Sequence, residues 1–257
     1  MRTSFYFLFW ILIYPILDIV GVPNGISFFV ALGAMIVLNR ILNSTMSPTL
    51  EFEKKLREMP MLSEVFEGDV NAFLTRLKGM RRLSLIGACY LVLNTLVLLY
   101  CVLVTDGKDW LLMLIFGYIA LGSVMRTVKY SQLISKITDN PTAEECMNVA
   151  CDDLNYDYPT YYEAMTSGGV KAYLEDKPSH FGIFQNVSMI IAVITSILGI
   201  ITFISGVVLT LRGSYIAGFV AGTMLLYGGL AFYYGITDCL EIGKNKGLLK
   251  KYSSTCC

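Results

Sequence analysis

Charged residues and histidine are scarce in this chain. Only 16% of its 257 residues are charged, against roughly a quarter in an ordinary soluble domain. The formal net charge is zero, so no excess of basic residues indicates a nucleic acid partner. The single histidine, His180, cannot supply the pair of ligands that zinc sites usually take from histidine.

The short motifs of common enzymes are also missing. The sequence has no Gly-x-Ser-x-Gly elbow, no phosphate-binding Gly-rich loop that ends in Lys-Ser/Thr, and no His-Glu-x-x-His. His180 and Ser205 lie about 37 Å apart along one predicted helix at about 1.5 Å per residue, so they cannot form a catalytic dyad. We therefore expect no enzymatic activity, no cofactor and no bound metal.

One stretch partly matches a calcium-binding loop. Asp153, Asn155 and Asp157 occupy the first three ligand positions of an EF-hand. The position that requires glycine holds Tyr158, however, and the twelfth position holds Ala164 in place of a bidentate glutamate. Calcium binding is therefore not expected.

The cysteines do not form a disulfide framework. There are 7 of them, an odd number, and they are spread over the predicted spans and loops. Cys146 and Cys151 lack the close Cys-x-x-Cys spacing of zinc and redox sites. The final Cys256-Cys257 follows two lysines, a pattern open to double lipidation in a eukaryote. Because a chain with several spans gains little from another anchor, reduced thiols are the favoured interpretation.

Hydrophobic residues, by contrast, make up 55% of the chain and are collected into long blocks. Each block is close to the roughly 20 residues that a helix needs to cross a hydrocarbon layer of about 30 Å. Short turns join the blocks in pairs. The sequence therefore predicts an all-α fold, a single polytopic transmembrane helical bundle over 1–257 with six spans in three hairpins. The spans are expected at about 5–20, 26–42, 83–104, 110–125, 184–211 and 215–236.

The positions of lysine and arginine predict the orientation. All of them except Lys108 and Arg212 lie near the N-terminus, in or directly beside the long loops 43–82 and 126–183, or in the tail 237–257. The positive-inside rule therefore places both loops and both termini in the cytoplasm, most naturally at the plasma membrane, although the rule is weaker for long loops. The first block resembles a signal peptide, but no small-x-small cleavage site follows it. Cleavage there would leave five spans.

The first loop is expected to form two amphipathic helices. Apolar residues recur at helical spacing from Thr49 to Met59, and Pro60 is expected to end that helix. A second amphipathic stretch covers 62–77 and includes two candidate partner-contact residues, Phe66 and Phe73. These helices would either dock a cytoplasmic partner or cover the inner ends of the bundle.

The second loop is acidic and rich in tyrosine. Thr142 is expected to cap a helix that runs to about Cys151, with Glu145 closing a capping box. Tyrosines after this helix offer large amphipathic surfaces of the kind found at protein interfaces. They are candidate partner-contact residues or, alternatively, a belt at the level of the lipid headgroups: Tyr156, Tyr158, Tyr161 and Tyr162.

Polar residues inside the spans are few. Asp238 lies near the inner end of the last span, where its side chain is expected to reach water. Asn94 lies near the middle of a span and is expected to hydrogen-bond between helices. Four glycines of the last span predict close helix packing or, alternatively, a helix break beside a binding site: Gly218, Gly222, Gly228 and Gly229.

Two functional classes are compatible with this pattern. The first is a non-catalytic membrane protein that works by protein contact, such as an accessory subunit, a scaffold or an immunity-type protein. Its support is the scarcity of polar groups within the spans beside large cytoplasmic loops. The second is a permease or transporter subunit whose amphipathic helices couple to a soluble partner. That alternative depends mainly on an analogy of fold.

Overall fold

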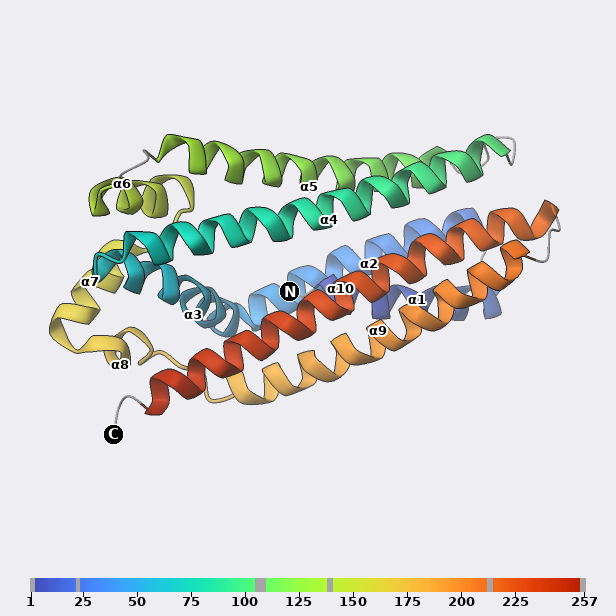
Figure 1. Ribbon diagram of the computed structural model, residues 1–257. Coiled ribbons are helices and arrows are strands. Elements are labelled where there is room, and N and C mark those ends of the chain that lie inside the picture. The colour runs from blue at the N-terminus through green and yellow to red at the C-terminus, as the bar shows by residue number, and fades with distance from the viewer. Residues whose placement is uncertain (1–2, 22–23, 105–109, 138–140, 212–214, 255–257) are drawn as a thin grey trace. The chain divides into compact units, whose positions relative to one another are not determined.

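Every element is helical in the part of the chain that the computed structural model describes, residues 3–21, 24–104, 110–137, 141–211 and 215–254 (Figure 1). The prediction of an all-α fold is confirmed. The elements are α1 (Thr3–Ile19), α2 (Asn24–Thr45), α3 (Ser47–Phe66), α4 (Val70–Val104), α5 (Trp110–Lys136), α6 (Ala143–Asn148), the π-helical turn η1 (Val149–Asp153), α7 (Tyr158–Ser167), α8 (Gly169–Tyr173), α9 (Phe181–Leu211) and α10 (Tyr215–Ser254).

The chain divides into two compact units. The first comprises Met1–Lys55, Asp176–Val208 and Tyr227–Cys257, and the second comprises Leu56–Glu175 and Leu209–Leu226. The first unit therefore contains α1, α2 and most of α9 and α10, whereas the second contains α4 to α8. The division falls inside α3, α9 and α10, which contribute residues to both units.

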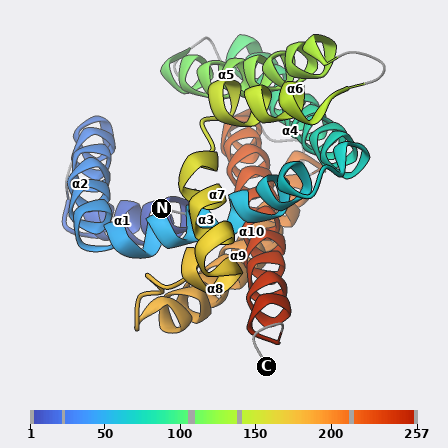
Figure 2. The ribbon, with the colours of Figure 1, turned by 90° about the vertical axis from the view of Figure 1, so that its left-hand side faces the viewer.

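In the second unit, α4 and α5 run side by side (Figure 1). Their ends join α6 to α8 and the second half of α3 in a folded part that we call the head, residues 56–80, 130–137 and 141–175. Figure 2 shows α5 and α6 next to each other there. Both predicted loops contribute to one core of buried side chains: Met61, Val65, Phe73, Leu77, Leu133, Ile137, Cys146, Val149 and Ala150.

The prediction that Pro60 ends a helix is wrong. α3 continues through Pro60 to Phe66. A proline inside a helix costs about 3 kcal/mol because it lacks an N–H group and its ring crowds the preceding turn. Neighbouring side chains offset this cost by burial, each contributing about 1.5–3 kcal/mol: Leu56, Met59, Met61 and Leu62 are all at most 1% exposed.

The end of α3 is set instead by a glycine turn. Gly68 has a φ of 76°, in the left-handed region that favours glycine. Its N–H donates to the Val65 carbonyl, and the Asp69 N–H donates to the Glu64 carbonyl, which together form a Schellman motif. The Asp69 carboxylate then accepts from the Ala72 N–H at 3.0 Å and caps α4. The second amphipathic stretch is therefore divided between α3 and α4.

In the first unit, α9 and α10 pack backbone to backbone. A Cβ on Gly228 would lie 2.4 Å from the Phe203 nitrogen, and one on Gly199 would lie 2.4 Å from the Phe232 nitrogen. Gly235 makes a third such approach, to Ala192 and Ser196. Only glycine permits these contacts, so the two helices approach more closely than larger residues would allow.

Two helical segments of the described residues are long and apolar enough to cross a membrane. They are Val70–Val97, with a mean hydropathy of 1.2, and Phe181–Leu209, with a mean hydropathy of 2.6. The segments Phe29–Thr45 and Ser47–Phe66 are bent by 76° relative to each other. If they count as one broken span, the number rises to three. This is fewer than the six expected, although a helix covers each of the six predicted positions.

Candidate functional site

The third segment of the head, residues 141–175, begins with the predicted capped helix. The Glu145 N–H donates to Thr142 Oγ1 at 3.2 Å, and the Thr142 N–H donates to Glu145 Oε2 at 3.1 Å. This capping box confirms the expected start of α6. Helical structure continues through η1 to Asp153, two residues beyond the expected end.

The stretch that partly matched an EF-hand consists of turn and capping residues. Asp153 accepts from Lys136 Nζ at 2.8 Å, and Asn155 has a left-handed φ of 54°. Asp157 accepts from the Thr160 N–H at 3.3 Å and caps α7. Across the described residues, no group of three or more His, Cys, Asp or Glu is placed to hold a metal ion.

Most of the aromatic cluster faces inward. The Tyr161 ring is fully buried, with its centroid 6.1 Å from that of Phe66 and 5.0 Å from that of Tyr173, both edge to face. The Tyr156 hydroxyl donates to Met61 Sδ at 3.5 Å, which links the second loop to the first. These rings hold the head together.

The candidate contact residues therefore separate into two groups. Tyr161 and Phe73 are both 0% exposed, so their assignment to a partner surface is corrected to one of core packing. Phe66, Tyr156 and Tyr158 are partly buried within the head. Tyr162 is 51% exposed and rests on the rings of Phe66 and Tyr158, with centroids 5.7 and 6.1 Å away.

The buried phenols and thiols of the head are held in their neutral forms. Burial, followed by the charges of neighbouring groups, raises the pKa of Tyr156 to about 12, and burial also raises the pKa of Tyr173. The pKa values of the Cys146 and Cys151 thiols are raised, chiefly by burial. Because the thiolate is the nucleophile of cysteine, neither thiol is activated.

The candidate packing residues have different surroundings. Asn94 donates to the Tyr90 carbonyl at 2.9 Å, one turn earlier in α4, so this bond lies within one helix and not between helices as expected. Gly228 and Gly229 are buried in α10, and the helix passes through them without a break. Gly218 and Gly222 belong to α10, but their side-chain surroundings lie outside the described residues, as do Cys256 and Cys257 altogether.

Sequence patterns missed a set of buried polar groups in the first unit. Asp238 is 7% exposed and Glu53 is 5% exposed. Asp238 Oδ2 accepts from the Ser4 N–H at 2.9 Å at the start of α1, where the positive end of the helix dipole stabilises a carboxylate. Glu53 Oε1 accepts from Asn245 Nδ2 at 3.0 Å. The expectation that Asp238 reaches water is therefore wrong. Its burial results from contacts with residues far away in the sequence, which no local pattern reveals.

The described residues thus define an all-helical protein that combines helices of membrane-spanning length with a folded polar head. The chain matches no protein-family model, no curated protein and no solved structure.

Proposed function

We propose that this chain is a six-span integral protein of the plasma membrane with both termini in the cytoplasm. It acts without catalysis, by binding a protein partner through its cytoplasmic loops. The partner role makes it an accessory subunit, a scaffold or an immunity-type protein.

A contact between the segments that flank α4 and α5 supports a larger number of spans than the hydropathy of the helices does by itself. Tyr156, which follows α5 in the chain, bonds to Met61, which precedes α4. If α4 crosses the membrane, the chain has to return before Tyr156 to make this contact. α5 is the helix that lies between, so the two helices cross as a pair.

The same reasoning applies to α9 and α10. Lys246 Nζ near the end of α10 donates to Asn186 Oδ1 near the start of α9, at 2.8 Å. Because Phe181–Leu209 is the more apolar of the two described segments that are long and apolar enough to cross a membrane, we assign α9 as a span. α10 is then the returning span that brings Lys246 back to Asn186.

Contacts with α10 also involve both ends of the hairpin that α1 and α2 form. Ser4 at the start of α1 meets Asp238, and Glu53 beyond α2 meets Asn245. Asp238 and Asn245 are about two turns apart on α10. The beginning and the end of this hairpin therefore reach the same stretch of α10, which supports a paired crossing of α1 and α2.

The observation that carries the partner role is the position of Tyr162. Its ring is half exposed on a head whose interior is otherwise well packed. Asp157 and Glu163 are exposed close to it in the sequence. A large ring fixed on a rigid surface loses little conformational freedom when it is covered, which is why tyrosine is enriched at binding hot spots.

The test is a substitution at Tyr162 in the full chain. We expect Tyr162→Ala to reduce recovery of the partner from mildly solubilised membranes by roughly 30-fold, the loss of about 2 kcal/mol that defines a hot spot. The matched control is Tyr100→Ala, because Tyr100 is 69% exposed but lies in the apolar part of α4. Recovery of the protein alone, at monomer mass, would contradict the proposal.

A point substitution is preferable to removing the acidic tyrosine stretch. Deleting 152–163 would also remove Tyr156 and Tyr161, which pack inside the head. Loss of the partner would then report unfolding of the head and not loss of a contact surface.

A permease or transporter subunit is the second candidate. The observation that favours it is the buried carboxylate of Asp238 among the packed helices of the first unit, since ionisable groups in such places often mark ion or substrate pathways. Recovery of a nucleotide-binding subunit with the chain would favour this candidate.

A further inference from the structure

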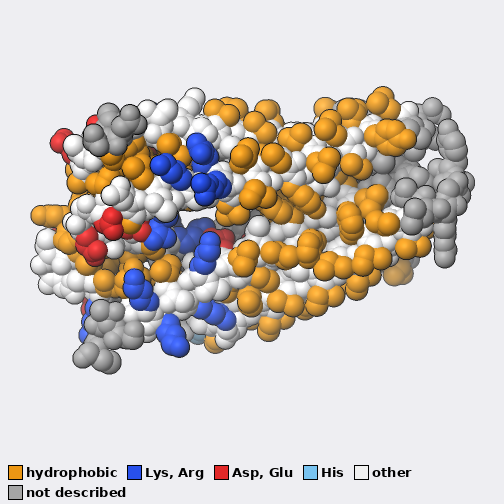
Figure 3. Space-filling model, viewed as in Figure 1, with side chains coloured by type: hydrophobic (Ala, Val, Ile, Leu, Met, Phe, Trp, Pro, Cys, Tyr) orange, Lys and Arg blue, Asp and Glu red, His pale blue; other side chains and the backbone are white. Residues whose placement is uncertain are grey.

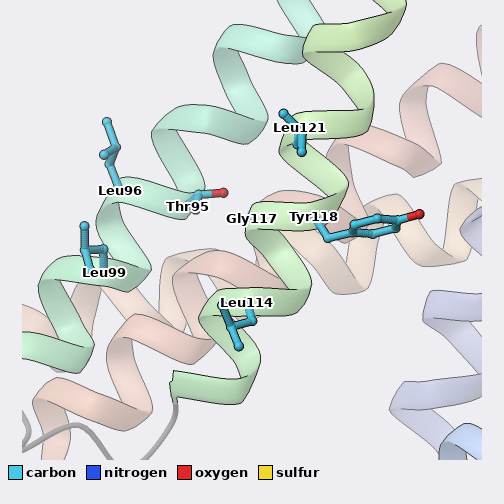
Figure 4. Close-up of a pocket in the computed structure, with 7 residues that line it drawn as sticks. All are labelled: Thr95, Leu96, Leu99, Leu114, Gly117, Tyr118 and Leu121. Carbon is cyan, nitrogen blue, oxygen red and sulfur yellow. The ribbon is translucent and has the colours of Figure 1, made fainter.

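An open apolar groove lies between α4 and α5 in the second unit (Figure 4). Its volume is about 360 Å³. Residues from both helices line it, among them Thr95, Leu96 and Leu99 of α4 and Leu114, Gly117 and Leu121 of α5. Two lining residues carry a hydroxyl. Thr95 donates to the Leu91 carbonyl of its own helix at 2.8 Å, and Tyr118 of α5 is 80% exposed, with its ring pointing away from α4 (Figure 4). The groove therefore suits a hydrocarbon chain.

Basic residues gather on the same two helices between the groove and the head. The hydroxyls of Ser84 on α4 and Thr127 on α5 are joined by a hydrogen bond of 2.9 Å. This bond serves as a common reference point for positions along the two helices. Within about two turns of this bond lie several exposed or half-exposed basic side chains: Lys78, Arg81, Arg82, Arg126 and Lys129. Figure 3 shows lysine and arginine side chains on α4 and α5 where their apolar surface begins.

The pairing of these basic residues differs from that of Arg76 and Lys136 in the head. Arg76 pairs with Glu64, and Lys136 pairs with Asp153. By contrast, Lys78, Arg81 and Lys129 have no ion-pair partner in the described part of the chain. An anion from outside the chain can therefore contact them without displacing an internal ion pair.

Helix geometry places part of this basic group on the groove side. Lys78 and Leu96 are about five turns apart on α4, and so are Arg81 and Leu99, so each pair shares a helix face. On α5, Lys129 follows Tyr118, another groove residue, by about three turns. The groove residues lie about 9–23 Å from the Ser84–Thr127 bond at about 1.5 Å per residue, and one leaflet of the hydrocarbon layer is about 15 Å deep.

We propose that the basic group and the groove together bind one anionic phospholipid. Its phosphate contacts Lys78, Arg81 and Lys129, and one acyl chain lies in the groove between α4 and α5. The charge decides between possible occupants. A second copy of the chain or a partner helix would fill the groove but leave the basic side chains unbalanced, whereas an anionic lipid satisfies both parts. The inference depends on the paired crossing of α4 and α5 and is independent of the partner at Tyr162.

The test compares phosphatidylglycerol with phosphatidylcholine of the same acyl chains. The full chain is purified in detergent, each lipid is titrated in, and bound lipid is counted by native mass spectrometry. We expect the wild type to retain phosphatidylglycerol in preference. In a Lys78→Gln/Arg81→Gln variant its affinity should fall roughly 10- to 30-fold, since each basic residue near a membrane surface contributes about a factor of five to anionic lipid binding. Lys171→Gln, an exposed lysine on α8, is the control and should bind as the wild type.

A second pair of variants tests the groove. A Cβ on Gly117 meets nothing within 4 Å, and the same is true of Gly122 on the same helix, outside the groove. Gly117→Leu should therefore fill the groove without a clash and weaken phosphatidylglycerol binding several-fold, whereas Gly122→Leu should not. Soluble glycerol 3-phosphate should compete poorly, because it lacks the acyl chain.

Two results would overturn the proposal. The first is equal retention of both lipids by the wild type, and the second is unchanged phosphatidylglycerol binding in both the charge variant and Gly117→Leu. A dimer that phosphatidylglycerol does not affect and that Gly117→Leu dissociates would assign the groove to a second copy of the chain. Failure of Tyr162→Ala to release a partner leaves these outcomes unchanged, so the two proposals fail separately.

Discussion

Tyr156 shows how a single phenol couples the stability of the head to pH. Burial is the largest cause of its raised pKa of about 12, and the charges of Tyr130 and Glu58 add to it, while Arg57 and Arg76 oppose it. The ordinary pKa of tyrosine, about 10, applies in the unfolded chain. The unfolded chain therefore loses this proton first as pH rises. The stabilisation is complete below pH 10 and is lost between pH 10 and about 12.

We expect a Tyr156→Phe variant to lose less stability at high pH than the wild type does. A difference of two pH units between the folded and unfolded pKa corresponds to about 2–3 kcal/mol of unfolding free energy, an upper bound because the ring is only partly buried. The measurement is the absorbance of tyrosinate during an alkaline titration in detergent. The variant should lose one late-titrating phenol, whereas in denaturant all phenols of both proteins should titrate near pH 10. An unchanged late fraction would contradict the assignment.

At the scale of one residue, local patterns predicted caps well and long-range burial poorly. Thr142 and Glu145 satisfy each other within one turn, so their capping box was visible in the sequence. The burial of Asp238 depends on Ser4, which lies 234 positions away. No short pattern contains that information.

The packing of α9 on α10 is the clearest feature at the scale of the element. The two helices touch through glycine, and any side chain at Gly228 would collide with the backbone of α9, which cannot move aside as a flexible side chain could. Gly243 lies further along α10 and has open space around its Cβ position. The two glycines therefore differ in surroundings while sharing the same helix.

We expect Gly228→Ala to lower the stability of the protein by about 1–3 kcal/mol, the usual cost of overpacking a close interface. Gly243→Ala should be neutral or slightly stabilising, because alanine favours helices by up to about 1 kcal/mol over glycine. Thermal unfolding of the purified protein in detergent measures both. Equal shifts in the two variants would show that the α9–α10 contact is not close in solution.

Both helix ends in the first loop were predicted wrongly from the sequence. Gly68 and Asp69 carry the signals of a helix end and a new cap and do separate α3 from α4, but the predicted amphipathic stretch 62–77 ran through them. Pro60 carries a stronger signal, yet α3 continues through it because buried neighbours on both sides offset its cost. Tertiary packing overrides local propensity at such positions.

The whole molecule was predictable in its all-helical class and less so in its assembly. Long apolar blocks predicted helices at six positions, and helices lie at all six. The head was not foreseen, because its core joins Met61 and Phe73 of one loop to Cys146 and Val149 of the other. Amphipathic spacing shows that a loop has an apolar face but not which distant segment covers it.

The proposed membrane arrangement leads to a prediction that tests whether α4 and α5 cross the membrane as a pair. Single cysteines would be introduced by Glu67→Cys between α3 and α4, by Gly107→Cys in the segment after α4, and by Glu163→Cys on α7. A membrane-impermeant maleimide is then applied to intact cells, and labelling is compared with that of the unsubstituted chain. With six spans, only Gly107→Cys should gain labelling in intact cells, and the other two should gain it after permeabilisation. If α4 crosses without α5, Glu163→Cys would instead label together with Gly107→Cys. That result would also be incompatible with the bond between Tyr156 and Met61, because the two loops of the head would then lie on opposite sides of the membrane.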